Sequence, residues 1–319
     1  MKLVAHGPLR PGCILALCAL VLMPACGATE GGEVAINQST TDSSSETVKV
    51  VRWKLPKALR EVSGLALDSQ GSVFAVADEE ARVFKLDAVT GEMLAVFSLG
   101  RPALRGDFEG IAWLNDWLYL ITSDGVLLRT RTGLGDTAID GTALNFERFE
   151  LATQCEIEGL TEDLENPWLW IACKEVTDSE AKASEALRLY AWDTAQKTLV
   201  AGATRELPTQ RLLELTDQKR FKPSGLSFIP ADPGAILLII SGAQRAWSTW
   251  RWSAEPALVA AGRLPKAHRQ PEGVAVTQAG ELLLADEGKG KAARLRVYPK
   301  GHSLVAEILE AIDWRLLNR

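Results

Sequence analysis

Histidine is scarce in this sequence, and its scarcity narrows the chemistry that the protein can perform. Three histidines occur among 319 residues, and one of them, His6, lies near the N-terminus. The remaining pair, His268 and His302, is too small a set for a histidine zinc site or a recognisable Ser/His/Asp triad. His268 stands in a predicted loop just before Glu272, where we expect it to be solvated. A Gly-x-Ser-x-Gly elbow and a phosphate-binding P-loop are also missing.

Clusters of lysine and arginine are absent as well. The chain has 35 basic residues, and without Lys2 and Arg10, which lie in residues 1–25, 33 remain against 41 acidic ones, a net charge of −8. Binding to nucleic acid depends on neutralising phosphates, so this acidic chain is a poor candidate for it. An acidic surface suits cations instead.

Apolar runs of membrane-spanning length are lacking too. The run from Cys13 to Met23 is too short to cross a bilayer as a stable helix and fits a signal peptide. It leads into Pro24-Ala25-Cys26-Gly27, which resembles a bacterial lipobox. We therefore predict a signal peptide over residues 1–25 and a lipid such as palmitate on Cys26. The alternative is an ordinary cleaved signal. By analogy with Gram-negative lipoproteins, Gly27 favours the outer membrane, facing the periplasm or the cell surface.

The residues after this cysteine divide into a tether and a domain. Residues 26–47 are polar, rich in serine and threonine, and almost free of large apolar side chains. Such a segment buries too little surface to offset its ordering entropy, so we expect a flexible tether. Residues 48–319 contain no second break of this kind, and their length suits a single all-β domain.

Few cysteines remain for the domain. Cys13 and Cys18 belong to the predicted signal peptide and Cys26 to the anchor. Cys155 and Cys173 flank a predicted hairpin and would fall nearly opposite each other across it. In an oxidising compartment this favours a disulfide, and the alternative is a pair of buried thiols.

One short module occurs five times along the chain. In each copy a polar residue precedes a glycine, and an apolar residue follows it. The copies are Ser63-Gly64-Leu65, Glu109-Gly110-Ile111, Glu158-Gly159-Leu160, Ser224-Gly225-Leu226 and Glu272-Gly273-Val274. The glycines are 46, 49, 66 and 48 residues apart, and the long interval carries a charged insertion at 178–185. A period of this size is typical of propeller blades.

Each module continues with further short strands. Examples are an apolar second run, Val73–Ala77, a more alternating third, Arg82–Leu86, and a fourth, Met93–Phe97. This pattern predicts an all-β fold of four-stranded antiparallel blades. The glycine would allow backbones to approach closely around a central channel. The apolar faces of each blade would be fully buried only in a closed ring.

The chain ends indicate how the ring closes. Val48–Pro56 precedes the first module and resembles the fourth strands that precede later modules. Such an N-terminal strand would complete the last blade and fasten the ring. We therefore predict a five-bladed β-propeller, with six blades as the alternative if region 203–222 hides a degenerate copy. The periodicity of Leu304–Leu317 is ambiguous.

Several longer segments repeat these features in a defined order. They are Leu55–Ala66, Val73–Glu80, Gly106–Ala112, Lys222–Ser227, Gln270–Ala275 and Asp286–Gly290. Over about residues 48–300 the set resembles the SdiA-regulated (YjiK/CarP-like) family of bacterial β-propellers. The resemblance implies a periplasmic or surface propeller with calcium binding or calcium-linked physiology. It also implies a looser kinship to phytase-like and gluconolactonase-like propellers, but no established reaction.

Two recurrent polar positions should face the channel, one before each glycine and one at the end of each second strand. Their acidic members are Glu109, Glu158, Glu272, Asp78, Asp124, Asp286 and Glu287. Three glutamates at one channel mouth repel one another unless a cation or shared protons compensate. All-oxygen ligands suit Ca²⁺ or Mg²⁺ rather than zinc, and Ca²⁺ tolerates irregular geometry better, so these residues are our candidate Ca²⁺ ligands. The alternative is a water-filled channel in which Lys174, with arginines such as Arg60 and Arg269, pairs with the carboxylates.

The sequence thus predicts an exported lipoprotein propeller that binds Ca²⁺ and acts in envelope binding or calcium-linked signalling. A metal-dependent hydrolase, either a phytase-like phosphoesterase or a lactonase or esterase, is the first alternative. A protein-interaction platform is the second, with weak support from ten tryptophans. Whether the protein is an enzyme stays open, and no catalytic residue can be named. We expect a monomer whose partners are a lipid bilayer and a metal ion, without nucleic acid.

Overall fold

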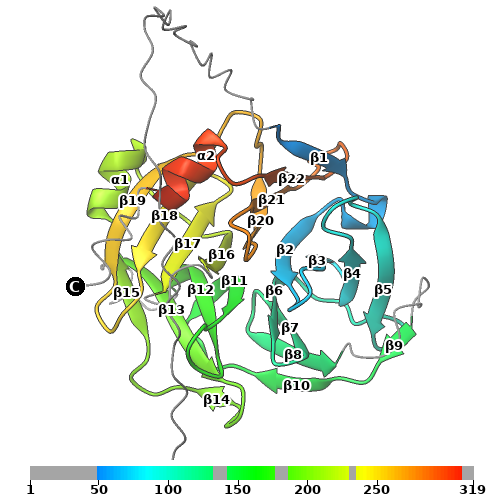
Figure 1. The fold of residues 1–319 in the computed structure, drawn as a ribbon. Coiled ribbons are helices and arrows are strands. Elements are labelled where there is room, and N and C mark those ends of the chain that lie inside the picture. The colour runs from blue at the N-terminus through cyan, green and yellow to red at the C-terminus, as the bar shows by residue number, and fades with distance from the viewer. Residues whose placement is uncertain (1–48, 132–141, 177–185, 230–234, 311–319) are drawn as a thin grey trace, which may run out of the picture. The chain divides into compact units, whose positions relative to one another are not determined.

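The described residues form five antiparallel sheets arranged radially around one axis, as Figure 1 shows. The computed structural model describes residues 49–131, 142–176, 186–229 and 235–310. The chain divides into two units, Met1–Ser45 and Glu46–Arg319, and every described residue belongs to the second. The predicted signal peptide, the tether and Cys26 lie outside the described residues.

The strands follow the repeat read from the sequence, with the innermost strand first in each blade. Blade 1 contains β2 (Val62–Leu67), β3 (Val73–Ala77), β4 (Arg82–Leu86) and β5 (Met93–Leu99). Blade 2 contains β6 (Phe108–Leu114), β7 (Trp117–Thr122), β8 (Val126–Arg131) and β10 (Glu147–Glu150). Blade 3 contains β11 (Cys155–Glu162), β12 (Trp168–Val176), β13 (Ala186–Asp193) and β14 (Thr198–Leu199). Blade 4 contains β16 (Gly225–Ile229), β17 (Ile236–Ser241), β18 (Ala246–Arg251) and β19 (Ala257–Arg263).

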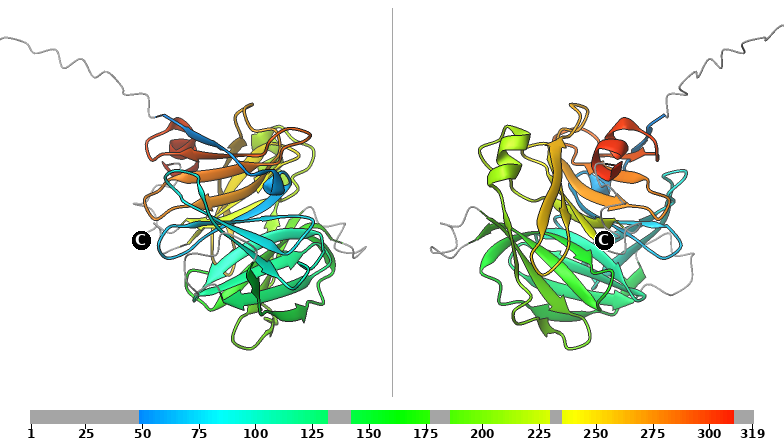
Figure 2. Two further views of the ribbon diagram at one scale, coloured as in Figure 1. Left: turned by 90° about the vertical axis from the view of Figure 1, so that its right-hand side faces the viewer. Right: turned by 60° about the vertical axis from the view of Figure 1, so that its left-hand side comes forward.

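Blade 5 confirms the predicted closure of the ring. It contains β20 (Pro271–Val276), β21 (Leu282–Asp286) and β22 (Arg294–Tyr298) from the C-terminal part of the chain. Its fourth strand is β1 (Val51–Lys54), which pairs antiparallel with β22 and places Val51 opposite Val297. Figure 2 shows this blue strand beside the orange strands. Hydrogen bonds between the two ends of the domain therefore hold the ring shut.

Apolar side chains fill the spaces between neighbouring blades. The described residues form five buried clusters, one at each blade interface. Strand β17 shows how one sequence serves two interfaces. Leu237 and Ile239 enter the cluster shared with blade 3, whereas Ile236, Leu238 and Ile240 enter the cluster shared with blade 5. Because successive side chains point to opposite faces of a strand, each blade depends on both neighbours for burial.

The repeated glycines occupy the closest approaches between inner strands, as predicted. A Cβ atom on Gly110 would lie 2.7 Å from the backbone nitrogen of Leu160 in the next blade. A Cβ atom on Gly64 would lie 3.0 Å from the backbone nitrogen of Ile111. Any larger residue would force these blades apart, which explains why the module centres on glycine.

Region 203–222 does not form a sixth blade. It contains β15 (Arg205–Pro208), which adds to the edge of β13, and α1 (Gln210–Thr216). Leu212 of this helix packs into the cluster between blades 3 and 4. A short strand, β9 (Thr142–Leu144), pairs in parallel with β5 and links the first two blades.

The remaining helical segments lie near the ends of the domain. They are η1 (Lys57–Leu59), α2 (Ser303–Val305) and the π-helical turn η3 (Ala306–Glu310). Leu304 and Ile308 from the last two pack into the cluster between blades 4 and 5. No helix among the described residues is long and apolar enough to cross a membrane.

A disulfide joins Cys155 in β11 to Cys173 in β12, with their Cα atoms 5.6 Å apart. The two strands are adjacent, but Cys173 lies opposite Ile157 and Cys155 opposite Val176. The bond therefore crosses the hairpin diagonally, at an irregularity of the strand register. It confirms the pairing predicted from the cysteine count.

Candidate functional site

The polar residues that precede the repeated glycines converge at one end of the channel. We call this group the acidic mouth: Ser63, Glu109, Glu158, Ser224 and Glu272. The inner strands β2, β6, β11, β16 and β20 contact one another in cyclic order, so these positions face a common axis. Sequence order alone predicted this grouping.

Local strand irregularities explain how these side chains reach the axis. In blade 1, Val62 pairs with Ala77 and Gly64 with Val76, so Ser63 has no opposite residue. The same shift leaves Glu109 and Glu272 without opposite residues in blades 2 and 5. A bulge of this kind releases a residue from the ladder and redirects its side chain. The mouth is therefore built from repeated bulges.

Crowding and burial of the carboxyl groups raise their pKa values. Burial, followed by the charges of Glu158 and Asp107, raises the pKa of Glu109 to about 9. Burial and the Glu158 charge raise the pKa of Glu272 to about 8, against hydrogen bonds from Gln270 and Ser224. Burial also raises the pKa of Glu158, although Lys174 opposes the change. In water at neutral pH, Glu109 and Glu272 therefore favour the protonated form.

One cationic side chain faces this group directly. Lys174 Nζ lies 3.0 Å from a carboxylate oxygen of Glu158 and 3.1 Å from one of Glu156. Burial lowers the pKa of Lys174, but its two carboxylate partners outweigh burial and raise it overall. The alternative in which Lys174 pairs with the carboxylates thus holds for Glu158. Glu109 and Glu272 are not among its ion-pair partners.

A second set of acids extends the mouth outward beside blades 1 and 2. Burial, together with Glu61, Glu79 and Asp107, raises the pKa of Asp78 to about 6. One carboxylate oxygen of Asp78 is buried without a hydrogen-bond partner among the described residues. Asp107 accepts a hydrogen bond of 2.7 Å from Ser123. Acidic side chains therefore continue from the axis toward the rim, where arginines also lie: Arg60 pairs with Glu61 and Arg82 with Glu80.

Sequence reasoning missed Asp107 and Glu61, although a signal was present. The residues two positions before those of the acidic mouth are Glu61, Asp107, Glu156, Lys222 and Gln270. Asp107 lies close enough to help raise the pKa of Glu109, and Glu61 close enough to help raise the pKa of Asp78. Reading the repeat two residues further upstream would have found the outer acids.

The other candidate ligands have different surroundings. Glu287 lies near the acidic mouth, because its charge helps to raise the pKa of Glu272. Asp124 accepts a hydrogen bond from Thr122 in its own blade. Asp286 is 4% exposed and lies in a separate buried network. The structure thus gathers Glu109, Glu158, Glu272, Asp78 and Glu287, and it places Asp124 and Asp286 in local hydrogen bonds.

The expectation of a solvated His268 is wrong. The side chain is fully buried, and its Nδ1 lies 2.8 Å from Asp286 while its Nε2 lies 2.7 Å from the Tyr298 hydroxyl. Asp286 also pairs with Arg296 and accepts a hydrogen bond of 2.9 Å from the Arg269 backbone. Asp286 and Tyr298 lie 18 and 30 positions after His268 in the sequence. Only the packing of blade 5 reveals them.

The family resemblance described above implies calcium binding, which requires oxygen ligands. The mouth offers oxygen atoms, among them the buried hydroxyl of Ser63, which has no hydrogen-bond partner among the described residues. Within the same residues, no three His, Cys, Asp or Glu side chains are grouped so that they could hold a metal ion. A cation at Glu109 or Glu272 would therefore need most of its ligands from backbone carbonyls and water, which Ca²⁺ accepts.

The space between the inner strands at the acidic mouth is small. Ser63, Glu109 and Glu272 line a cavity of about 10 Å³ there, together with the apolar side chains of Leu65, Leu226 and Val274. That space is roughly enough for one water molecule.

Comparison with known proteins assigns no family to the chain. No family model matches the sequence, and no curated protein is similar to it. Among solved structures, the chain is similar to a luciferin-regenerating enzyme, with 11% identity and a TM-score of 0.49 over 79% of this chain and 96% of that one. It is also similar to glutaminyl cyclase from Myxococcus xanthus, with 14% identity and a TM-score of 0.48 over 79% and 97% of the chains.

A third similar structure is virginiamycin B lyase from Staphylococcus aureus, with 13% identity and a TM-score of 0.41 over 76% of this chain and 68% of that one. At these identities and TM-scores the similarities assign neither a family nor a function. The propeller fold of the chain follows from its own five sheets.

Proposed function

We propose that the acidic mouth is a cation-binding site and that Ca²⁺ is the ion it suits best. The observation that supports this proposal is the convergence of Glu109, Glu158 and Glu272 on one buried channel mouth, with Lys174 paired to only one of them. Like charges held together in a poorly solvated site need protons or a cation to compensate them. An ion would replace the protons that Glu109 and Glu272 otherwise retain.

The small number of protein carboxylates sets an expected affinity. Calcium sites with many fixed carboxylates bind tightly, whereas extracellular modules with fewer bind with dissociation constants of about 10⁻⁴–10⁻³ M. Two glutamates supplemented by carbonyls and water belong to the weaker class. We therefore expect binding at the calcium concentrations found outside cells.

The location of the protein is part of the same proposal. The lipobox-like sequence at Cys26 would anchor the propeller to a membrane of the bacterial envelope. A disulfide such as Cys155–Cys173 forms and persists in oxidising compartments, which supports export. We further propose that the chain belongs with the SdiA-regulated propellers and that it serves envelope binding or calcium-linked signalling.

The proposal is tested by titrating CaCl₂ into purified protein treated with EDTA, while recording the melting temperature. We expect the wild type to gain stability with an apparent dissociation constant in the range above, and Glu109→Gln/Glu272→Gln to lose the gain. Glu92→Gln removes a charge from an exposed position outside the mouth and should respond like the wild type.

Absence of any calcium-dependent shift in the wild type would reject calcium as the ion. Hydrolysis of phosphoesters or lactones that requires Glu109 and Glu272 would instead assign the mouth to the hydrolase alternative.

A further inference from the structure

The opposite end of the channel carries a much larger pocket. Its volume is about 740 Å³, within the range of small-molecule sites. The last residues of four inner strands line it: Leu67, Leu114, Glu162 and Val276. Leu65, Leu226 and Val274 line both this pocket and the small cavity at the acidic mouth. Ser63, Glu109 and Glu272 line the small cavity alone, so the acids of the mouth do not reach this pocket.

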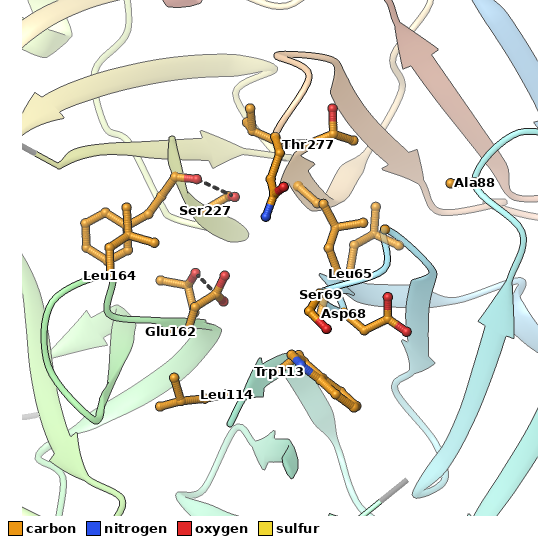
Figure 3. Close-up of a pocket in the computed structure, with 18 of the residues that line it drawn as sticks. Leu65, Asp68, Ser69, Ala88, Trp113, Leu114, Glu162, Leu164, Ser227 and Thr277 are labelled. Carbon is orange, nitrogen blue, oxygen red and sulfur yellow. Dashed lines mark hydrogen bonds between the residues drawn. The ribbon is translucent and has the colours of Figure 1, made fainter. Parts of the chain in front are cut away.

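Apolar side chains form much of the wall, as Figure 3 shows around the labelled residues Leu65, Trp113, Leu114 and Leu164. Leu164 is 40% exposed. The Trp113 ring is only partly buried and stacks on Phe74, with ring centroids 5.4 Å apart. Covering this surface with an apolar ligand would remove it from water, which favours binding.

The charged groups of the pocket are all acidic. Among the described residues that line it, Asp68, Asp116, Glu162 and Glu281 are the ionisable ones, and lysine, arginine and histidine do not occur. Asp68 is occupied, because it accepts hydrogen bonds from two backbone N–H groups of its turn and pairs with Lys85. Glu281 accepts a weak hydrogen bond from Thr277. An anionic ligand would meet repulsion from every charged wall residue.

Glu162 is the acid best placed to meet a ligand. Figure 3 shows its carboxylate directed toward the open centre of the pocket, with one hydrogen bond of 3.3 Å from the adjacent Thr161. Burial raises the pKa of Glu162 to about 7, and no cation offsets this effect among the described residues. Glu162 keeps some exposure to solvent, so a ligand can reach it. A partly buried carboxylate without a cationic partner gains most from a ligand that brings a positive charge.

We propose that this pocket binds a small amphiphilic amine, whose protonated nitrogen pairs with Glu162 and whose apolar body packs against Trp113, Leu114 and Leu164. A cation near the half-exposed Trp113 ring would also gain from the aromatic face. This site lies beyond the proposed cation site, uses none of its residues, and selects a different class of ligand. The two ends of the channel would then bind chemically different ligands.

Three probes with the same apolar body test the proposal: phenethylamine, 2-phenylethanol and 3-phenylpropionate. Each is titrated into the full-length protein at about pH 8, where Glu162 is largely ionised and the amine is still protonated. Binding is measured by saturation-transfer NMR and tryptophan fluorescence. We expect the amine to bind at least tenfold more tightly than the alcohol, and the carboxylate to bind most weakly. Equal affinities, or no saturable binding of the amine, would overturn the proposal.

Variants then locate the binding. Glu162→Gln should reduce the affinity for the amine about tenfold and leave the alcohol unchanged. Glu165→Gln removes the same charge from an exposed position three residues away and should change neither.

Leu164→Ser alters an exposed wall residue that the fold does not require, and it should weaken the amine and the alcohol alike. Amine binding that survives both Glu162→Gln and Leu164→Ser would place the ligand elsewhere and refute the inference. Circular dichroism of each variant checks that the fold is retained.

Discussion

Replacing Glu109 by glutamine should stabilise the protein at neutral and alkaline pH when divalent ions are absent. The folded state raises the pKa of this carboxyl from its usual 4.5 to about 9. Between those values the folded protein holds a proton that the unfolded chain releases. The contribution of Glu109 to stability is therefore greatest below about pH 4.5, and it falls as the pH rises toward 9. Glutamine cannot ionise, so the variant escapes this loss.

The size of the effect follows from the linkage between protonation and folding. Each pH unit above 4.5 costs the wild type at most about 1.4 kcal/mol. At pH 7 the limit is therefore about 3 kcal/mol, and solvent screening of this partly exposed group reduces it. We expect Glu109→Gln to exceed the wild type in free energy of unfolding by about 1–3 kcal/mol at pH 7 and by about zero near pH 4.5.

Urea unfolding in EDTA at several pH values between about 5 and 9 measures this difference. Glu92→Gln, at an exposed position, supplies the control and should follow the wild type. A gap between Glu109→Gln and the wild type that stays constant with pH would refute the reasoning, because the carboxyl would then have an ordinary pKa in the folded state. A gap that shrinks as the pH rises would refute it as well.

Three further perturbations test the ring itself. Gly110→Ala should lower the free energy of unfolding by several kcal/mol, because its Cβ atom would lie 2.7 Å from the backbone of the next blade. Gly202→Ala is the control: this glycine lies in a left-handed turn with open space around it, so the substitution should cost only about 1 kcal/mol. Thermal unfolding measures both. Replacing Cys155 and Cys173 by alanine should lower the free energy of unfolding by about 3 kcal/mol, as expected for the loss of a disulfide that closes a loop of 18 residues. A reducing agent should lower the melting temperature of the wild type and leave that of the variant unchanged. Deleting β1 (Val51–Lys54) should open blade 5 and abolish a single cooperative transition in calorimetry; a normal transition would show that the closing strand is dispensable.

Most of the fold was readable from the sequence because its determinants are local and repeated. The spacing of the glycines indicated the number of blades, and short runs, either apolar like Val73–Ala77 or more alternating like Arg82–Leu86, indicated the strands. The surplus strand before the first module gave the closure. The α-helix at Gln210–Thr216 was missed, because it is short and its apolar face is defined only by the cluster it packs against.

The candidate site was predictable only in part. The repeat placed Glu109, Glu158 and Glu272 on one axis, since equivalent positions in a ring must meet. It could not show that Lys174 pairs with Glu158 or that Asp286 is committed to His268 and Arg296. Those pairings depend on side-chain positions across strands, and no pattern within one strand encodes them.

The sequence by itself therefore determined the five-bladed ring, its closing strand and the disulfide partners, because backbone pairing and period-2 burial follow from residue order. The tertiary structure decided which acids stay uncompensated and which apolar residues surround Glu162. Burial and distance between blades set the protonation of these groups, and both exist only once the ring is closed. That is why the acidic mouth was expected from the repeat, whereas the pocket at the other end of the channel was not.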